Sequence, residues 1–315
     1  MKTVALIGGR GYTGAELLGL LARHPGLDLA FASSTSQAGL PVREICPAWP
    51  DAEAKLVALS ADAVPTRSAD AWVLAVPNGA AAEWAVAIEA AHPDAVIIDL
   101  SADYRFDEDW AYGLPELNRD AIIGAKRIAN PGCYATAAQL ALAPIADRLE
   151  TTPSLFGVSG YSGAGRTPSP KNDPERLADN LMPYALAGHM HEREVSHRLG
   201  RPVRFMPHVA SFFRGISMTV AARLESPVTV DDLETLYRER YADEPRVSVS
   251  REIPEVTTVR ETPDAIVGGF TVSPDDPCEI TVVSVLDNLS KGAASQALQN
   301  LNLALGLDEH MGLDT

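Results

Sequence analysis

The first 24 residues constrain the fold most. A short apolar run at residues 4–7 meets glycines at 8, 9, 11 and 14, and a leucine-rich segment, 15–24, follows directly. This order predicts a buried parallel strand, a tight turn and a helix. The pattern then repeats, with predicted strands at 27–33, 71–76 and 95–100 and an alanine-rich helix at 79–91. Strands that alternate with helices predict an α/β fold, a Rossmann-type doubly wound parallel sheet.

The pattern changes after residue 132. A helix is expected over 134–149, interrupted at Pro144, which lacks a backbone donor. Strands are predicted at 155–159, 203–206, 216–224, 247–250 and 279–287, with a helix at 231–241 and a final helix at 291–305. Residues 167–183 hold four prolines and predict a long loop. This half therefore predicts an α+β domain with an antiparallel or mixed sheet.

Charge and cysteine content exclude several protein classes. The chain of 315 residues carries 42 acidic and 26 basic residues, a net charge of -16, so no basic surplus exists for nucleic acid or an acidic membrane. A small anionic substrate needs only local arginines and stays possible. Three widely spaced cysteines fit neither a disulfide framework nor a zinc site. The apolar N-terminal run meets glycine at once, unlike a signal peptide, and no uncharged stretch approaches the ~20 residues of a membrane span. We expect a cytoplasmic protein.

The glycine turn suits a dinucleotide pyrophosphate. Gly8, Gly11 and Gly14 allow a tight turn and close backbone approach to the phosphates at the helix N-terminus. Similar turns join strands to helices in many α/β proteins. About 20 residues on, where an NAD site usually has Asp or Glu, this chain has the hydroxyls of residues 33–36, which favours NADP. Arg10 is either a phosphate partner or a solvated surface arginine.

A lone cysteine, Cys133, is a second candidate for a functional residue. Cys133 follows Pro131-Gly132 directly and precedes the helix expected from residue 134. Unpaired N–H groups and the positive end of the dipole favour the thiolate there, against a pKa of about 8.5 for free cysteine. The alternative is a small buried core residue. Cys46 and Cys278 lack such a context, and we interpret both as structural.

Nine motifs carry a family resemblance, in order along almost the whole chain. They are GYTGAELL from Gly11, LSADYR from Leu100, YGLPEL from Tyr112, NPGCY from Asn130, SGAGR from Ser162, GHMH from Gly188, PH at 207–208, RGI from Arg214 and LDNLSKGAA from Leu286. Together they resemble N-acetyl-γ-glutamyl-phosphate reductase, an NADP-dependent family of arginine biosynthesis. The resemblance implies that an acyl phosphate is reduced to an aldehyde through a cysteine thioester, which splits one hard step into two.

The resemblance also assigns roles to residues. Cys133 is the expected nucleophile and His189 the acid/base, because histidine exchanges protons near neutrality. The substrate's phosphate and carboxylate call for arginines. Expected substrate contacts are Arg105, Ser162, Arg166, His191, Glu194, His208 and Arg214. Expected NADP(H) contacts are Gly8, Arg10, Gly11, Tyr12, Thr13, Gly14, Ser33, Ser34, Ser36, Gly163, Gly165 and Asn288.

Each assignment has a structural alternative. An arginine of the set is equally a structural ion pair, and Asn288 is equally a helix cap. The histidine pair at 189 and 191 alone would fit a surface pair or adventitious metal; no metal is expected from two histidines without a nearby cysteine. The helix after Asn288 is expected to pack on the dinucleotide domain. The predicted domains are therefore 1–132 plus 293–315 for NADP binding and 133–292 for catalysis.

The acyl group and the assembly stay open at this stage. Phe212, Phe213 and Phe270 stand where the family has other residues, so they affect the expected acyl pocket. Alternative functions are aspartate-semialdehyde dehydrogenase, a reductase of carrier-linked aminoadipyl or glutamyl phosphate, and a non-catalytic NADP(H)-sensing regulator. By resemblance the partners are a small acyl phosphate and further copies of the chain, as a homodimer or homotetramer. The sequence does not decide whether 167–183 closes over the substrate.

Overall fold

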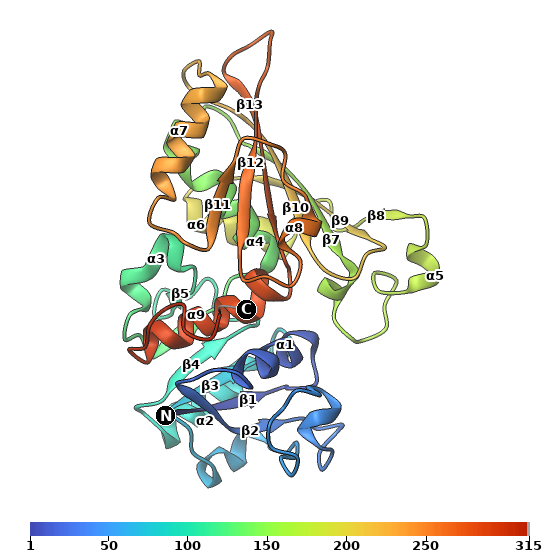
Figure 1. The fold of residues 1–315 in the computed structure, drawn as a ribbon, viewed down its shortest axis with the longest axis vertical. Coiled ribbons are helices and arrows are strands. Elements are labelled where there is room, and N and C mark those ends of the chain that lie inside the picture. Colours follow the sequence, from blue (N-terminus) through green and yellow to red (C-terminus); the bar gives the residue numbers. More distant parts are fainter. Residues whose placement is uncertain (314–315) are drawn as a thin grey trace. The chain divides into compact units, whose positions relative to one another are not determined.

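The computed structural model describes residues 1–313 and divides into two compact units. Unit 1 consists of Met1–Gly132 together with the C-terminal segment from Ala293, and unit 2 is Cys133–Gly292. Figure 1 shows the C-terminal helix of unit 1 beside elements of the N-terminal half.

Unit 1 is built on a six-stranded sheet in which all neighbours pair in parallel, with the strand order β2-β1-β3-β4-β6-β5. Its strands are β1 (Lys2–Ile7), β2 (Leu27–Ser33), β3 (Ala71–Leu74), β4 (Val96–Asp99), β5 (Ala111–Tyr112) and β6 (Arg127–Ala129). Its helices are α1 (Tyr12–Leu21), α2 (Ala81–Ala91), α3 (Pro115–Ile122) and α9 (Ser295–Ala304), with 3₁₀ turns η1 (Val42–Glu44) and η2 (Ala61–Thr66).

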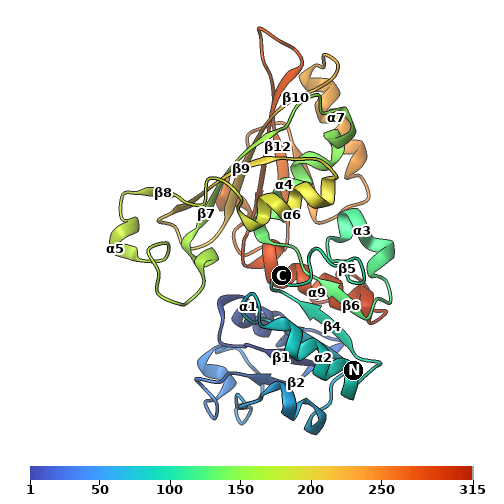
Figure 2. The same ribbon diagram turned by 180° about the vertical axis from the view of Figure 1, so that it is seen from behind.

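Both faces of this sheet are covered, as β1 illustrates. Val4 and Leu6 point to the face that holds the leucines of α1 and the apolar residues of α9. Ala5 and Ile7 point to the other face, where Ile88 of α2 packs. Figures 1 and 2 show α1 and α2 on opposite faces of the sheet. Burial on both faces explains why the strands are continuous apolar runs.

Unit 2 is built on a seven-stranded mixed sheet with the order β11-β12-β13-β10-β7-β9-β8. Its strands are β7 (Ser154–Gly160), β8 (Leu181–Pro183), β9 (Arg204–Ala210), β10 (Ile216–Arg223), β11 (Val247–Ser250), β12 (Ala265–Val272) and β13 (Glu279–Leu286). Its helices are α4 (Cys133–Leu142), α5 (Pro174–Leu177), α6 (Met190–Leu199), α7 (Val230–Arg240) and α8 (Val256–Val259), with 3₁₀ turns η3 (Ala143–Arg148) and η4 (Tyr161–Ala164) and a π-helical turn η5 (Ser290–Ala294).

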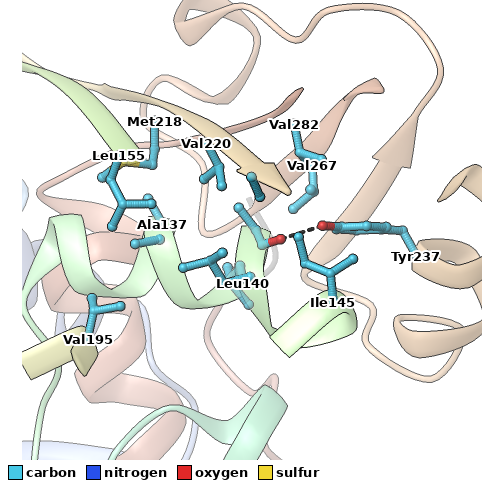
Figure 3. Packing of buried hydrophobic residues seen from close by; sticks show 14 of the residues in the cluster. Ala137, Leu140, Ile145, Leu155, Val195, Met218, Val220, Tyr237, Val267 and Val282 are labelled. Atoms are coloured by element: carbon cyan, nitrogen blue, oxygen red, sulfur yellow. Dashed lines mark hydrogen bonds between the residues drawn. The ribbon is translucent and has the colours of Figure 1, made fainter. Parts of the chain in front are cut away.

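The core of unit 2 lies between α4 and one face of this sheet. Met218 and Val220 alternate with half-exposed and exposed residues along β10 and are buried beneath α4, as Figure 3 shows. The Tyr237 hydroxyl of α7 donates to the carbonyl of Ala141, which the end of α4 leaves without a helical donor. Each fully buried apolar side chain contributes about 1.5–3 kcal/mol. The core thus fixes α4, and with it the position of Cys133 at its first residue.

The fold class expected from the sequence is confirmed, and the break at Pro144 is found where α4 gives way to η3. The segment 167–183, predicted as a long loop with little regular structure, contains two short elements, α5 and β8. Asp173 caps α5 by accepting from the Glu175 and Arg176 N–H groups, and β8 pairs with β9 at the edge of the sheet. Strand pairing at an edge depends on a distant partner, so composition alone conceals it. Within residues 1–313, no helix is long and apolar enough to cross a membrane.

Candidate active site

Cys133 is the first residue of α4. Strand β6 ends at Ala129, and Asn130-Pro131-Gly132 connects it to the helix. The half-buried Cys133 therefore stands at the helix end whose first N–H groups have no partner within the helix. This is the placement that the sequence indicated, and it favours a thiolate at this position.

Tyr134 holds an aromatic cluster next to the cysteine. Its hydroxyl donates to the carbonyl oxygen of His208 at 2.6 Å. Its ring centroid lies 6.4 Å from that of His189, 5.8 Å from that of His191 and 4.9 Å from that of Phe205. The structure thus brings the histidine pair of α6 to the residue that follows Cys133 in the chain.

His189 is the N-cap of α6. Its Nδ1 accepts the N–H of His191 at 3.1 Å, so the neutral ring carries its hydrogen on Nε2. Burial, and after it the charge of Lys171, lower the pKa of His189 to about 4, against the opposing charge of Glu192. His189 is therefore neutral at pH 7 and presents an Nε2–H donor.

Glu192 is a functional residue that sequence reasoning missed. Its Oε1 accepts the N–H of Gly188 at 3.0 Å and its Oε2 accepts the N–H of Phe205 at 2.8 Å, so it ties the turn before His189 to β9. A glutamate three residues after an N-cap is a recognisable signal. Glu194, which the sequence favoured, is fully buried in the same helix.

Tyr184 is a second residue that was missed. Its ring lies edge-on to His189, with 5.5 Å between the centroids. Burial raises the pKa of Tyr184 well above its usual value, and the nearby charge of Cys133 adds to this. Tyr184 therefore lies in the same cluster as Cys133 and His189. A tyrosine at the end of a proline-rich segment gave no local signal of this.

Asp287 anchors three segments of unit 2. It is fully buried, and its carboxylate accepts the Arg214 Nε–H at 2.6 Å and the backbone N–H groups of Glu261 at 2.7 Å and Leu289 at 2.8 Å. The expected substrate contact of Arg214 stays a prediction; in the structure its Nε belongs to this ion pair. Removing one partner of such a buried pair typically costs about 3–5 kcal/mol.

Asn288 joins two further loops. Its Oδ1 accepts the Gly215 N–H at 2.6 Å and its Nδ2 donates to the Ser162 hydroxyl at 2.9 Å. Both ends of the Asn288 amide are therefore used in structural contacts, and its contact with the cofactor stays a prediction. Gly163 and Gly165 lie in and directly after η4, beside Ser162. Arg166 follows and is exposed.

Gly292 lies directly against Cys133. A Cβ built on Gly292 would lie 2.7 Å from the Cβ of Cys133 and 3.1 Å from Cδ1 of Leu286. The Gly292 N–H donates to the Asp287 carbonyl at 2.9 Å, across the π-helical turn. Single π turns occur frequently at functional sites. The turn therefore brings backbone against Cys133 where no side chain fits.

Arg105 of unit 1 supports the segment that leads to the cysteine. It is buried, its Nε donates to the Asn130 carbonyl at 3.0 Å and its Nη2 to the Leu100 carbonyl at 3.1 Å. The structure therefore gives this arginine backbone contacts in addition to the substrate contact that the resemblance implies.

The glycine turn of unit 1 has the geometry that a dinucleotide needs. Gly8 has φ +89°, and a Cβ there would lie 2.2 Å from the Ala75 carbonyl oxygen; one on Gly14 would lie 2.7 Å from the Gly8 oxygen. A Cβ on Gly11 would meet only the Gly8 oxygen, at 3.6 Å, so packing does not demand this glycine. Tyr12 and Thr13 begin α1, so their N–H groups belong to the helix N-terminus, where a phosphate is favoured.

Arg10 and the serines after β2 come together. The Arg10 Nη1 donates to the Ser36 hydroxyl at 2.8 Å. Ser33 and Ser34 are buried at the end of β2, whereas Arg10 is exposed. The group combines a cation and hydroxyls without a carboxylate, which suits an extra phosphate.

Two residues expected near the substrate have packing contacts elsewhere in the structure. His208 was expected to bind substrate, but β9 points its ring to the opposite sheet face from Phe205, where it packs on Phe156 at 4.4 Å. Strand residues alternate between faces, so only its carbonyl reaches Tyr134. Phe270 was expected to affect the acyl pocket; it lies in the core instead, with its ring 4.8 Å from that of Tyr237. Phe213 is partly exposed and packs on Tyr161.

The remaining cysteines lie elsewhere. Cys46 is buried in the core of unit 1, and burial raises the pKa of its thiol. The Cys278 N–H donates to Asp276 at the start of β13. Across residues 1–313, no group of three histidine, cysteine, aspartate or glutamate side chains is arranged to hold a metal ion.

Comparison with known proteins identifies the family. Residues 3–125 match the semialdehyde dehydrogenase NAD-binding domain, and residues 133–288 match the semialdehyde dehydrogenase dimerisation domain. N-acetyl-gamma-glutamyl-phosphate reductase of Xanthomonas axonopodis pv. citri is 54% identical over 312 residues, 99% of this chain and 98% of the relative. The protein of the same name from Stenotrophomonas maltophilia is 54% identical over 98% of this chain and 96% of the relative.

Solved structures agree on the fold. Aspartate semialdehyde dehydrogenase II of Vibrio cholerae superimposes with a TM-score of 0.78 at 20% identity, over 97% of this chain and 98% of that chain. The Candida albicans aspartate semialdehyde dehydrogenase, solved with NADP, gives 0.72 at 14% identity, over 96% of this chain and 100% of that chain. At these identities the likeness shows the fold alone, whereas the sequence relatives settle the family. The chain is an oxidoreductase that belongs to the N-acetyl-gamma-glutamyl-phosphate reductase family of semialdehyde dehydrogenases.

Proposed function

We propose that this chain reduces N-acetyl-γ-glutamyl phosphate to N-acetyl-L-glutamate 5-semialdehyde and phosphate, with NADPH as reductant. The observation that carries the proposal is the cluster of Cys133, at the start of α4, with the neutral His189 at the start of α6. Membership of the reductase family supports the acyl group. We also propose that the protein is cytoplasmic, because free cysteines persist in a reducing compartment.

Cys133 forms and breaks the covalent bond. Its thiolate attacks the γ-carbonyl carbon, the C–O bond to phosphate breaks, and phosphate leaves with that electron pair, so that a thioester forms. When bound, the reduced nicotinamide supplies the hydride that converts the thioester to a hemithioacetal. The C–S bond then breaks, the aldehyde is released, and Cys133 regains its thiolate.

His189 acts on the carbonyl oxygen. Because Nδ1 accepts from the His191 N–H, the neutral ring offers Nε2–H as a donor. A hydrogen bond from Nε2 to the oxygen stabilises the negative charge that develops in both tetrahedral states. This refines the acid/base role expected from the sequence, since the cap favours a hydrogen-bond donor over a free base at Nε2.

The semialdehyde assay panel tests the substrate. The wild type is expected to reduce NADP in a phosphate-dependent reaction with N-acetylglutamate semialdehyde. Aspartate semialdehyde and carrier-linked aminoadipyl or glutamyl semialdehydes are the competing substrates. Absence of any response to the acetylated compound, with a response to another member, would overturn the substrate. A non-catalytic regulator would bind NADP(H) and turn over none of them.

The Arg10–Ser36 pair supports NADP over NAD. We expect Arg10→Gln to lower kcat/KM for NADPH by about tenfold, because one charge-assisted contact to the 2′-phosphate is lost, and to leave NADH unchanged. Ser36→Ala should lower kcat/KM for NADPH by a smaller factor. The exposed Lys55 provides the control variant Lys55→Gln, which removes a surface charge of the same unit. Equal losses with both dinucleotides would contradict the assignment.

A homodimer, alone or paired into a homotetramer, completes the proposal. The match to a dimerisation domain covers unit 2. One face of its sheet packs on α4, while the other presents Phe156, 38% exposed, and Ala221. Light scattering on the purified chain measures the state directly, and a monomer at all concentrations would refute this part.

A further inference from the structure

The segment between η4 and β8 has a defined conformation. Asn172 fixes it: its Nδ2 donates to the carbonyls of Gly165 at 2.7 Å and Thr167 at 2.8 Å, and its Oδ1 accepts the Ser169 N–H at 2.7 Å. The amide thereby ties together the residues that precede it. The position of its neighbour Lys171 is consequently set by the backbone.

Lys171 lies against the candidate active site. Its Nζ stands over the ring of Tyr184, 4.7 Å from the centroid. The Tyr184 N–H donates to the Pro207 carbonyl at 3.2 Å, which anchors it to β9, and its ring packs on His189. Lys171 is close enough that its charge lowers the pKa of His189, and the Cys133 charge in turn raises that of Tyr184.

Lys171 has no acidic partner among residues 1–313. Within residues 1–313, no carboxylate lies within 4.0 Å of its ammonium group, although the chain has 42 acidic residues for 26 basic ones. The side chain is half-buried. Partial burial of an unpaired charge costs free energy, and a cation–π contact at such a site returns only about 0.5–1 kcal/mol. A cation retained here without a partner is suited to an anion that arrives from solution.

We propose that Lys171 binds an anionic oxygen of the substrate at the active site, as a point charge over Tyr184 and beside His189. The inference rests on the proposed function, whose substrate carries a phosphoryl group and a carboxylate. A lysine ammonium accommodates either group, because it imposes no bidentate geometry. The two sources are separated by experiment.

The first test measures anion binding without turnover. Neutral iodoacetamide alkylates Cys133, and inorganic phosphate or N-acetyl-L-glutamate is added as the protecting anion. Lys171→Gln should raise the half-protecting concentration of at least one anion by about tenfold or more, as expected for a lost charged contact. Lys171→Arg, which keeps the charge, should restore most of it. The matched control is Arg176→Gln, which removes an exposed charge from the same segment.

The result also identifies the group that Lys171 binds. Weaker protection of Cys133 by phosphate indicates the phosphoryl group, and weaker protection by N-acetyl-L-glutamate indicates the carboxylate. The inference would be overturned if neither anion protected the wild type. It would also be overturned if the half-protecting concentrations of Lys171→Gln and Arg176→Gln agreed within about twofold. Lys171 would then be a structural cation–π residue.

The second test uses the phosphate-dependent oxidation of the semialdehyde. Lys171→Gln should raise KM for the affected substrate by about tenfold, with a smaller change in kcat, because a binding contact is removed. The wild type could be inactive with N-acetylglutamate semialdehyde while protection of Cys133 still depends on Lys171. That result would refute the proposed substrate and retain the anion site. Active variants with unchanged KM for both phosphate and semialdehyde would retain the proposed function and reject the role of Lys171.

Discussion

Cys133→Ser is expected to abolish turnover, by at least about 10⁴-fold, while reduced dinucleotide still binds. A serine hydroxyl stays protonated at neutral pH, and the start of a helix does not change this enough to produce an alkoxide. The substitution exchanges one atom at a half-buried first residue of α4, so the fold is retained. Turnover is measured with the semialdehyde and phosphate, and cofactor binding by quenching of protein fluorescence.

The other two cysteines provide the control. Cys46→Ala and Cys278→Ser should keep the wild-type turnover, since Cys46 lies in the core of unit 1 and Cys278 at the start of β13. Iodoacetamide should label Cys133 much faster than either, because its helix position favours the thiolate. A loss of turnover in Cys133→Ser smaller than about 10⁴-fold would contradict the role of Cys133 as nucleophile. Equal labelling rates of all three cysteines would contradict it as well.

Features with a local cause could be predicted from the sequence. The turn at Gly8 needs a positive φ and Gly14 lies against backbone, so their residue types follow from geometry within seven residues. Cys133 begins α4 because a Pro-Gly pair precedes it, and α4 ends before Pro144 because proline breaks the hydrogen-bond ladder. Each of these constraints is contained in a few neighbouring residues.

Strand β12 and helix α6, two of the elements that were missed, have sequences that lack periodicity. Strand β12 contains Gly268 and Gly269, which weaken a strand signal, and the structure has a register shift there. Helix α6 is polar, with Val195 buried, and it is defined mainly by its ends: the His189 N-cap and Gly200 in the left-handed conformation. The sequence contains the two cap residues, but the residues between them show no helical hydrophobic periodicity.

The role of a charged residue depends on partners that are remote in sequence. Arg214 fitted both a substrate contact and an ion pair, and its carboxylate partner, Asp287, lies 73 residues away. Lys171 belongs to a segment whose composition indicated only a loop, and Tyr184 directly follows that segment. The pairing of β8 with β9 nevertheless brings both residues to the neighbourhood of His189. Sequence spacing does not encode such meetings, because they are set by tertiary packing.

Gly292→Ala is expected to lower kcat by about 100-fold or more, because a shift of about 1 Å at a reacting group has that effect. The added methyl would lie 2.7 Å from the Cβ of Cys133 and 3.2 Å from the Asp287 carbonyl oxygen. The first atom belongs to the backbone-fixed start of α4, and the second already accepts the Gly292 N–H. Neither can move as the end of a flexible side chain does, so the strain displaces the nucleophile.

The matched control for this prediction is Gly19→Ala. A Cβ there meets nothing within 4 Å, and the residue lies inside α1, so the change should stabilise unit 1 by about 0.5–1 kcal/mol and leave kcat unchanged. Overpacking at Gly292 costs about 1–3 kcal/mol of folding free energy, which urea unfolding measures separately from activity. A folded Gly292→Ala enzyme with altered iodoacetamide reactivity at Cys133 and lost turnover would locate the damage at the thiol. Full activity in that variant would mean that the π-helical turn and the cysteine yield to each other, and that the close backbone contact does not hold the nucleophile.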